Sequence, residues 1–111
     1  MSDKLIIAIK IKKTIEYVDK VLINYPKVEY VLRNNIINTF YILLENVYRS
    51  NIYKDTKYMK ECIVNIKMIE YYIKISLDKK LLSYKKFENI GKYLLEINKM
   101  LNSWIMYEKS R

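Results

Sequence analysis

Apolar residues recur along this chain at spacings of three and four, which is the period of a helix that buries one face. Four segments show the pattern. The inward positions of the first two are Ile7, Ile11, Ile15, Val18, Leu22 and Tyr25, then Leu32, Ile36, Phe40, Leu43 and Val47. Those of the last two are Met59, Cys62, Ile66, Ile69, Ile73 and Leu77, then Phe87, Ile90, Leu94, Ile97, Leu101 and Trp104.

Punctuating residues divide the four segments. Pro26 stops the first helix and suits the first turn of the second, because it has no amide hydrogen to continue the ladder. Asp55 or Thr56 can cap the third helix, and Ser83 the fourth. We therefore expect helices at about 3–25, 26–52, 55–78 and 83–108 in a single domain, 1–111. Short links force neighbours to be antiparallel, which predicts an all-α, up-down-up-down antiparallel four-helix bundle.

Composition supports helices over strands. The chain has one glycine and one proline, too few for the turns of a sheet protein, although its many isoleucines favour strands. The single tryptophan, Trp104, follows Leu101 by three residues and completes the last apolar stripe. We expect Trp104, Leu101 and Pro26 to be core or interface anchors; the alternative for Trp104 is a ring that stacks on a ligand.

The formal charge is +9, from 21 Lys and Arg against 12 Asp and Glu. Such an excess indicates a polyanionic partner, namely nucleic acid, an anionic membrane or an acidic protein surface. The alternative is the coding bias of a low-GC genome, which enriches lysine, isoleucine, asparagine and tyrosine together. One cysteine excludes an internal disulfide, and the apolar run "LIIAI" is too short for a signal peptide or for a membrane span of roughly 20 residues. We expect a soluble, cytoplasmic protein.

Lysines form stripes opposite the predicted apolar faces. The candidate nucleic-acid-binding residues are Lys10, Lys13 and Lys20 of the first helix and Lys57, Lys60, Lys67 and Lys74 of the third. Lysines along a phosphate backbone release counterions, and the interleaved Tyr17 and Tyr71 can stack on unpaired bases. The fourth helix repeats the stripe with Lys85, Lys92 and Lys99, diluted by acids. The alternative is that these are ordinary solvated faces. The second helix is nearly neutral and aromatic-rich, which suits burial against another subunit.

Residues for catalysis are scarce. Without histidine the chain lacks the commonest general base and metal ligand, and one cysteine offers no activated thiol pair. The single glycine, Gly91, lies mid-helix and makes no phosphate-binding loop. We therefore expect no enzyme activity, no catalytic residues, no metal, no cofactor and no small-molecule substrate.

Two stretches, "YPKVEYVLRNNI" and "MIEYYIKISLDKKLLSYKKFENIGKYLLEINKMLNSW", resemble a family of small four-helix-bundle proteins. The family includes Avd, the accessory variability determinant of diversity-generating retroelements, and proteins encoded in intervening sequences of ribosomal RNA genes. The resemblance spans nearly the whole chain. It implies a homo-oligomer, a pentameric barrel with a basic surface, whose partners are RNA or DNA and the retroelement's reverse transcriptase.

The resemblance also implies a partner-binding site. The family often places two arginines four residues apart on the exposed side of its third helix, linked to contact with the transcriptase. Here those positions are Glu70 and Lys74. One charge is kept and one is reversed, which argues against transcriptase binding or implies a partner with adjusted charge. The alternative function is that of an oligomer, orphan or encoded in a ribosomal RNA intervening sequence, with a structural or general RNA-binding role and no transcriptase partner. A third possibility is a membrane-surface helix, since "KLIIAIKIKK" is basic and amphipathic, but a bundle buries that apolar face.

Overall fold

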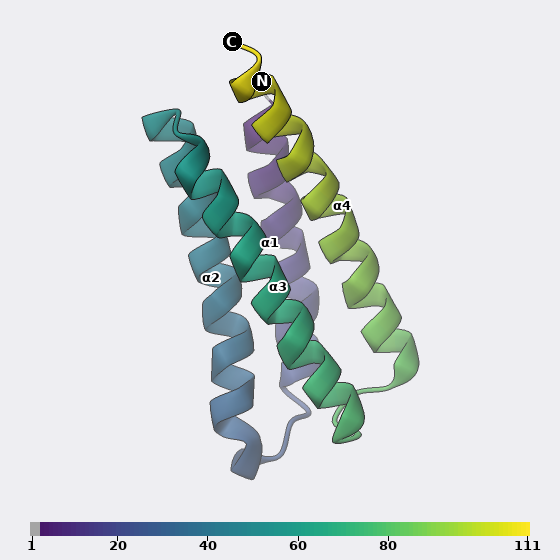
Figure 1. Cartoon of the computed structure of the whole chain (residues 1–111). Helices are drawn as coiled ribbons and strands as arrows, with labels where there is room; N and C mark the ends of the chain where they lie inside the picture. Colours follow the sequence, from purple (N-terminus) through teal and green to yellow (C-terminus); the bar gives the residue numbers. More distant parts are fainter. Residues whose placement is uncertain (1–2) are drawn as a thin grey trace.

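The computed structural model describes residues 3–111, with side chains from Ile6 onward. It contains α1 (Asp3–Leu22), a short 3-10 turn η1 (Lys27–Glu29), α2 (Tyr30–Tyr53), α3 (Thr56–Asp78) and α4 (Tyr84–Lys109). The chain reverses direction at each connection, so both termini lie at one end (Figure 1). The prediction of an all-α protein with four helices is confirmed for the described residues.

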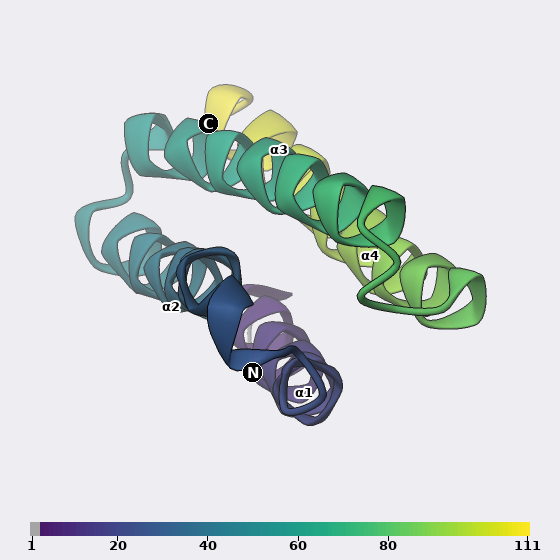
Figure 2. The same ribbon diagram turned by 90° about the horizontal axis from the view of Figure 1, so that it is seen from below.

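Each helix packs against two others. α2 packs against α1 and α3, and α4 packs against α3 and α1, whereas the backbones of α1 and α3 lie diagonally opposite, with no Cα atoms within 8 Å of each other in the described part of the chain. Seen from the end, the helices occupy the corners of a distorted square (Figure 2). The molecule measures 47 × 23 × 21 Å, so a single helix length sets its long axis.

The first corner differs from the sequence prediction. α1 ends at Leu22 and not at Tyr25, and α2 begins at Tyr30 and not at Pro26. The residue before a proline is pushed out of helical geometry, and Pro26 itself is extended, with φ −60° and ψ 151°. Pro26 marks the corner as predicted, and it is exposed, so it is not part of the core of the bundle. Lys79 Nζ, 3.0 Å from Glu29 Oε1, ties η1 to the end of α3.

The other two links use capping residues. Asp55 accepts a hydrogen bond of 2.9 Å from the Lys57 amide, and Ser83 accepts one of 3.2 Å from the Lys86 amide. In each of these two links a lysine adopts the left-handed backbone conformation, with φ 58° at Lys54 and 62° at Lys80. Glycine, which adopts such angles without strain, is absent from both links, and the chain's one glycine lies inside α4.

The core is the set of predicted apolar faces. Leu101 and Trp104 are buried as expected, and so is Cys62. Four predicted core positions are only half-buried because they lie at the edges of their faces: Ile15, Leu32, Leu77 and Phe87. Small polar residues complete the core, and they satisfy their hydroxyls by donating to the carbonyl four residues earlier. These bonds are Thr14 to Lys10, Ser50 to Asn46 and Ser76 to Tyr72.

No helix in the described part of the chain has the length and hydropathy of a membrane span.

Candidate nucleic-acid interface

The lysine positions predicted to bind nucleic acid lie on two helices that are diagonally opposite in the bundle. α1 carries Lys10, Lys13 and Lys20, and α3 carries Lys57, Lys60, Lys67 and Lys74. Because α1 and α3 occupy opposite corners of the bundle, α2 and α4 separate the two stripes (Figure 2). The structure therefore does not bring the seven lysines into one surface.

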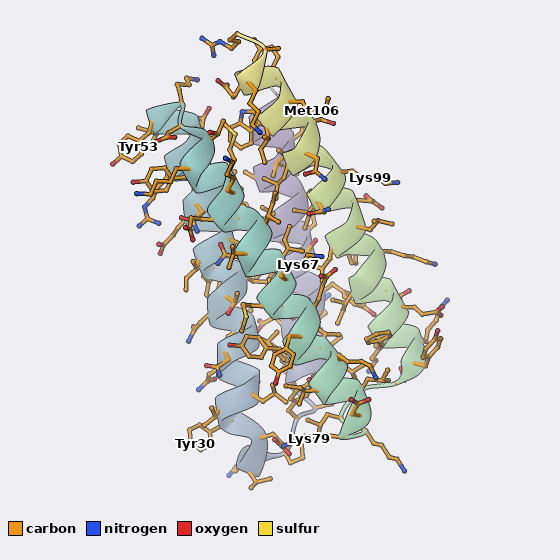
Figure 3. The ribbon with its side chains drawn as sticks, viewed as in Figure 1. Tyr30, Tyr53, Lys67, Lys79, Lys99 and Met106 are labelled. Carbon is orange, nitrogen blue, oxygen red and sulfur yellow. The ribbon has the colours of Figure 1, made fainter. Side chains whose placement is uncertain are left out.

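The α3 stripe carries its own counterions. Lys67 Nζ lies 3.8 Å from Glu70 Oε1, and Lys74 Nζ lies 2.8 Å from Asp78 Oδ1. Lys67 projects from the outer side of α3 (Figure 3). All four of these side chains are more than half exposed, so the pairs add little stability, but they weaken the local positive potential. Both candidate partner-binding residues, Glu70 and Lys74, are exposed and engaged within their own helix.

The α1 stripe lies beside the lysines of α4. Lys92 lines an open pocket together with Tyr17 of α1, so the two helices contribute to one surface. Lys85 and Lys99 are exposed two turns away on either side of Lys92, and Figure 3 shows Lys99 projecting outward from α4. We call this surface, defined by Lys13, Lys20, Lys85, Lys92 and Lys99 around the pocket, the α1–α4 face.

The pocket has a volume of about 380 Å³ and is lined by Tyr17, Asn89, Lys92, Tyr93 and Glu96. The Asn89 amide donates a hydrogen bond of 3.1 Å to the Tyr17 hydroxyl. The Tyr17 and Tyr93 rings are 5.5 Å apart between centroids and inclined at 44°, a favourable tilted aromatic contact. Both rings are half-buried, and one comes from each helix.

Lys10 has a different place from the one predicted. Its Nζ lies 2.6 Å from Glu96 Oε2 and 5.1 Å from the centroid of the Tyr93 ring, and its side chain is 23% exposed. The charge of Lys10 is therefore directed at Glu96 and Tyr93. This contact neutralises the acid at the pocket wall and holds Tyr93 by a cation–π interaction. Lys10 supports the pocket, whereas Lys13 and Lys20 are exposed at its side.

Sequence reasoning missed Asn89 and Tyr93. Their spacing of four residues places both on one side of α4, which is a signal that the pattern contains. To predict that these residues contact Tyr17, however, one must know which residues of α1 and α4 lie at the same level along the bundle axis. Residue spacing within one helix does not give this.

The thiol is unsuited to chemistry. Cys62 is buried on the side of α3 that packs against α2, with its Sγ 3.9 Å from the Leu43 carbonyl oxygen. Burial disfavours the thiolate and raises the pKa of Cys62 to about 12. Among the residues that the structure describes, no three acidic or thiol groups lie close enough together to hold a metal ion.

A protein-family model described as bAvd-like matches residues 5–108, from the first turn of α1 almost to the end of α4. The chain belongs to the bAvd-like family. The resemblance identified from the sequence is thereby confirmed, and the four helices of the structure agree with it. No curated protein matches the chain. In this bAvd-like protein, the α1–α4 face and the α3 stripe present exposed lysines on different sides of the bundle.

Proposed function

We propose that this bAvd-like protein is a non-enzymatic, cytoplasmic accessory protein of a diversity-generating retroelement. It binds nucleic acid and the reverse transcriptase through the basic surface of a homopentameric barrel of up-down-up-down bundles, and so supports mutagenic copying of RNA into cDNA. Family membership supports the proposal. The observation that carries it is the α1–α4 face, where Tyr17 and Tyr93 lie beside Lys92, with Lys13 and Lys20 on the same side of α1 as Tyr17.

Nucleic-acid binding follows from charge and spacing. Exposed lysines on one helix side repeat at about one or two turns, so several can meet successive phosphates of one strand. Glu96, the acid that lines the pocket, is already paired with Lys10. The α3 stripe, with Lys57, Lys60, Lys67 and Lys74, contributes less because its own acids compete with phosphate.

Two matched triple variants test the proposal. Lys13→Ala, Lys20→Ala and Lys92→Ala together remove three charges from the α1–α4 face, and Lys60→Ala, Lys67→Ala and Lys74→Ala remove three from α3. Affinity for a single-stranded RNA is measured by fluorescence anisotropy over a range of salt concentrations. We expect the first triple to lower the slope of log affinity against log salt by about 0.7 for each lysine engaged, and the second to lower it less. Equal effects would show that net charge alone matters, and no effect of either would contradict the proposal.

Transcriptase docking is tested separately. Glu70 and Lys74 lie one turn apart on the exposed side of α3, and the proposed partner is a reverse transcriptase of the same retroelement. Lys74→Glu is expected to weaken co-purification with that enzyme while RNA affinity changes little. Light scattering of the purified protein should give the mass of five copies of the 13.6 kDa chain.

One observation favours the second candidate, an oligomer with a structural or general RNA-binding role and no transcriptase. Glu70 and Lys74 already have partners on their own helix, Lys67 and Asp78. A neighbouring gene without reverse-transcriptase sequence, together with normal RNA binding, would favour this candidate over the first.

A further inference from the structure

The pocket of the α1–α4 face holds two aromatic rings, one from each helix, that further contacts keep in place. Tyr17 is held by its hydrogen bond from Asn89, and Tyr93 contacts both the Tyr17 ring and the Lys10 ammonium. A ring that is already fixed loses little freedom when a second ring packs on it. By contrast, Tyr71 on the α3 stripe is 60% exposed, and its ring centroid lies 6.0 Å from that of its chain neighbour Tyr72.

Size and polarity indicate what the pocket accepts. Its 380 Å³ lies near the lower end of the roughly 300–1,000 Å³ typical of sites for small organic groups. The walls offer aromatic surface from Tyr17 and Tyr93 and polar groups from Asn89 and Glu96. This combination suits a flat ring with polar edges.

Charge indicates what the ring is attached to. Lys92 lines the pocket, while Lys13 and Lys20 lie four residues before and three residues after Tyr17, on the same side of α1. Glu96 is offset by Lys10 at 2.6 Å, and the lysines at the edge are exposed, so an anion can reach them. A flat polar ring joined to phosphates on both sides is a nucleotide within a strand.

We infer that the pocket between α1 and α4 accepts one unpaired base of a nucleic-acid strand, which stacks against the Tyr17–Tyr93 pair while Lys13, Lys20 and Lys92 contact the adjoining phosphates. The inference rests on the proposed nucleic-acid binding. It adds that the protein prefers single strands, because the bases of a duplex are paired and stacked inside the helix. Stacking on aromatic side chains tolerates any base, so little sequence preference is expected.

Three oligonucleotides of equal length test the inference with the unmodified full chain: a single strand with all its bases, a strand of the same backbone with abasic sites throughout, and a duplex. Binding is followed by fluorescence anisotropy at low salt. The strand with bases is expected to bind about five- to hundredfold more tightly than the abasic strand, which is the range for loss of one base–aromatic stack.

Variants then locate the effect. Tyr93→Leu keeps an apolar side chain but removes the ring, and it should abolish the preference for bases. Tyr93→Phe keeps the ring and should retain the preference, and Tyr71→Leu is the matched control on α3. Circular dichroism verifies that each variant is helical; if Tyr93→Leu does not fold, the comparison of the strands on the unmodified protein still decides.

The outcomes separate the two proposals. Equal affinity for strands with and without bases, or a duplex bound as tightly as the single strand, overturns the base pocket and leaves phosphate binding intact. Loss of the preference in Tyr71→Leu but not in Tyr93→Leu also overturns it. Failure to bind any of the three oligonucleotides at low salt overturns the proposed function, and the base pocket with it.

Discussion

Asn46 of α2 donates a hydrogen bond of 2.9 Å to the side-chain oxygen of Asn65 on α3. Asn46 is only 7% exposed, and its own oxygen accepts a bond of 3.2 Å from Arg49 Nη1. The contact between α2 and α3 is otherwise largely apolar, and it includes Leu43 and Cys62. The bond therefore specifies which residues of the two helices face one another, because shifting one helix along the other would leave a buried amide without a partner.

Asn46→Ala should lower the free energy of unfolding by about 1–3 kcal/mol, since Asn65 is left in a partly buried place without its donor. Urea denaturation of the single variants and of the double variant with Asn65→Ala measures the coupling. A coupling above about 0.5 kcal/mol is expected for residues in contact. Asn38→Ala, an exposed asparagine of the same helix, is the control. Purely additive effects would show that the bond does not stabilise the fold.

Two leucines of α4 test whether the stability contributed by a leucine depends on its burial. Leu101 is fully buried and Leu95 is 54% exposed. Leu101→Ala should lower the free energy of unfolding by roughly 2–5 kcal/mol, through lost apolar burial and the cavity that remains. Leu95→Ala should cost much less, because that side chain remains largely in water in the folded protein. Similar denaturation midpoints for the two variants would contradict the placement of α4.

Gly91 is a site for stabilisation. It lies inside α4, and a methyl group added there meets no atom within 4 Å. Gly91→Ala should raise the free energy of unfolding by roughly 0.5–1 kcal/mol, because alanine loses less backbone freedom on forming a helix. Thermal unfolding followed by circular dichroism should show a melting temperature a few degrees higher. Lys80→Ala, placed at a left-handed position with φ 62°, is the contrast and should bring no such gain.

The buried thiol of Cys62 should resist alkylation. Because burial raises the pKa of Cys62 from 9.0 to about 12, its thiolate fraction at pH 8 is about a thousandfold lower than that of an ordinary cysteine. Iodoacetamide should label the native protein very slowly and the urea-unfolded protein quickly, as measured by mass spectrometry. An added exposed thiol, Ser103→Cys, provides the internal control.

The same pKa fixes the sign of a pH effect. The unfolded thiol ionises near its ordinary pKa and the folded one only near 12, so the unfolded state binds fewer protons in between. This contribution to stability is fully present below pH 9 and is lost as the pH rises toward 12. Cys62→Ala should therefore lose less stability than the parent over that interval. A steeper loss in Cys62→Ala would contradict the burial of the thiol.

Much of the fold was predictable because a helix depends on residues that are only three or four positions apart in the sequence. Apolar spacing gave four helices and most of the buried residues, and Asp55 and Ser83 were correct as caps. The first corner was placed wrongly by a few residues, because Pro26 restricts Tyr25 as well as itself. Small polar residues such as Thr14 and Ser76 also lie in the core, and their hydroxyl bonds back to the helix made that possible.

The sequence by itself determined the four helices, their apolar faces and the lysine stripes, since each depends on the spacing of residues within one segment. The tertiary structure decided which stripes are neighbours. It placed α1 beside α4 and away from α3, directed Lys10 at Glu96, and joined Tyr17 to Asn89 and Tyr93. Those contacts depend on how two helices align along their length, which is set by the packing of all four faces together.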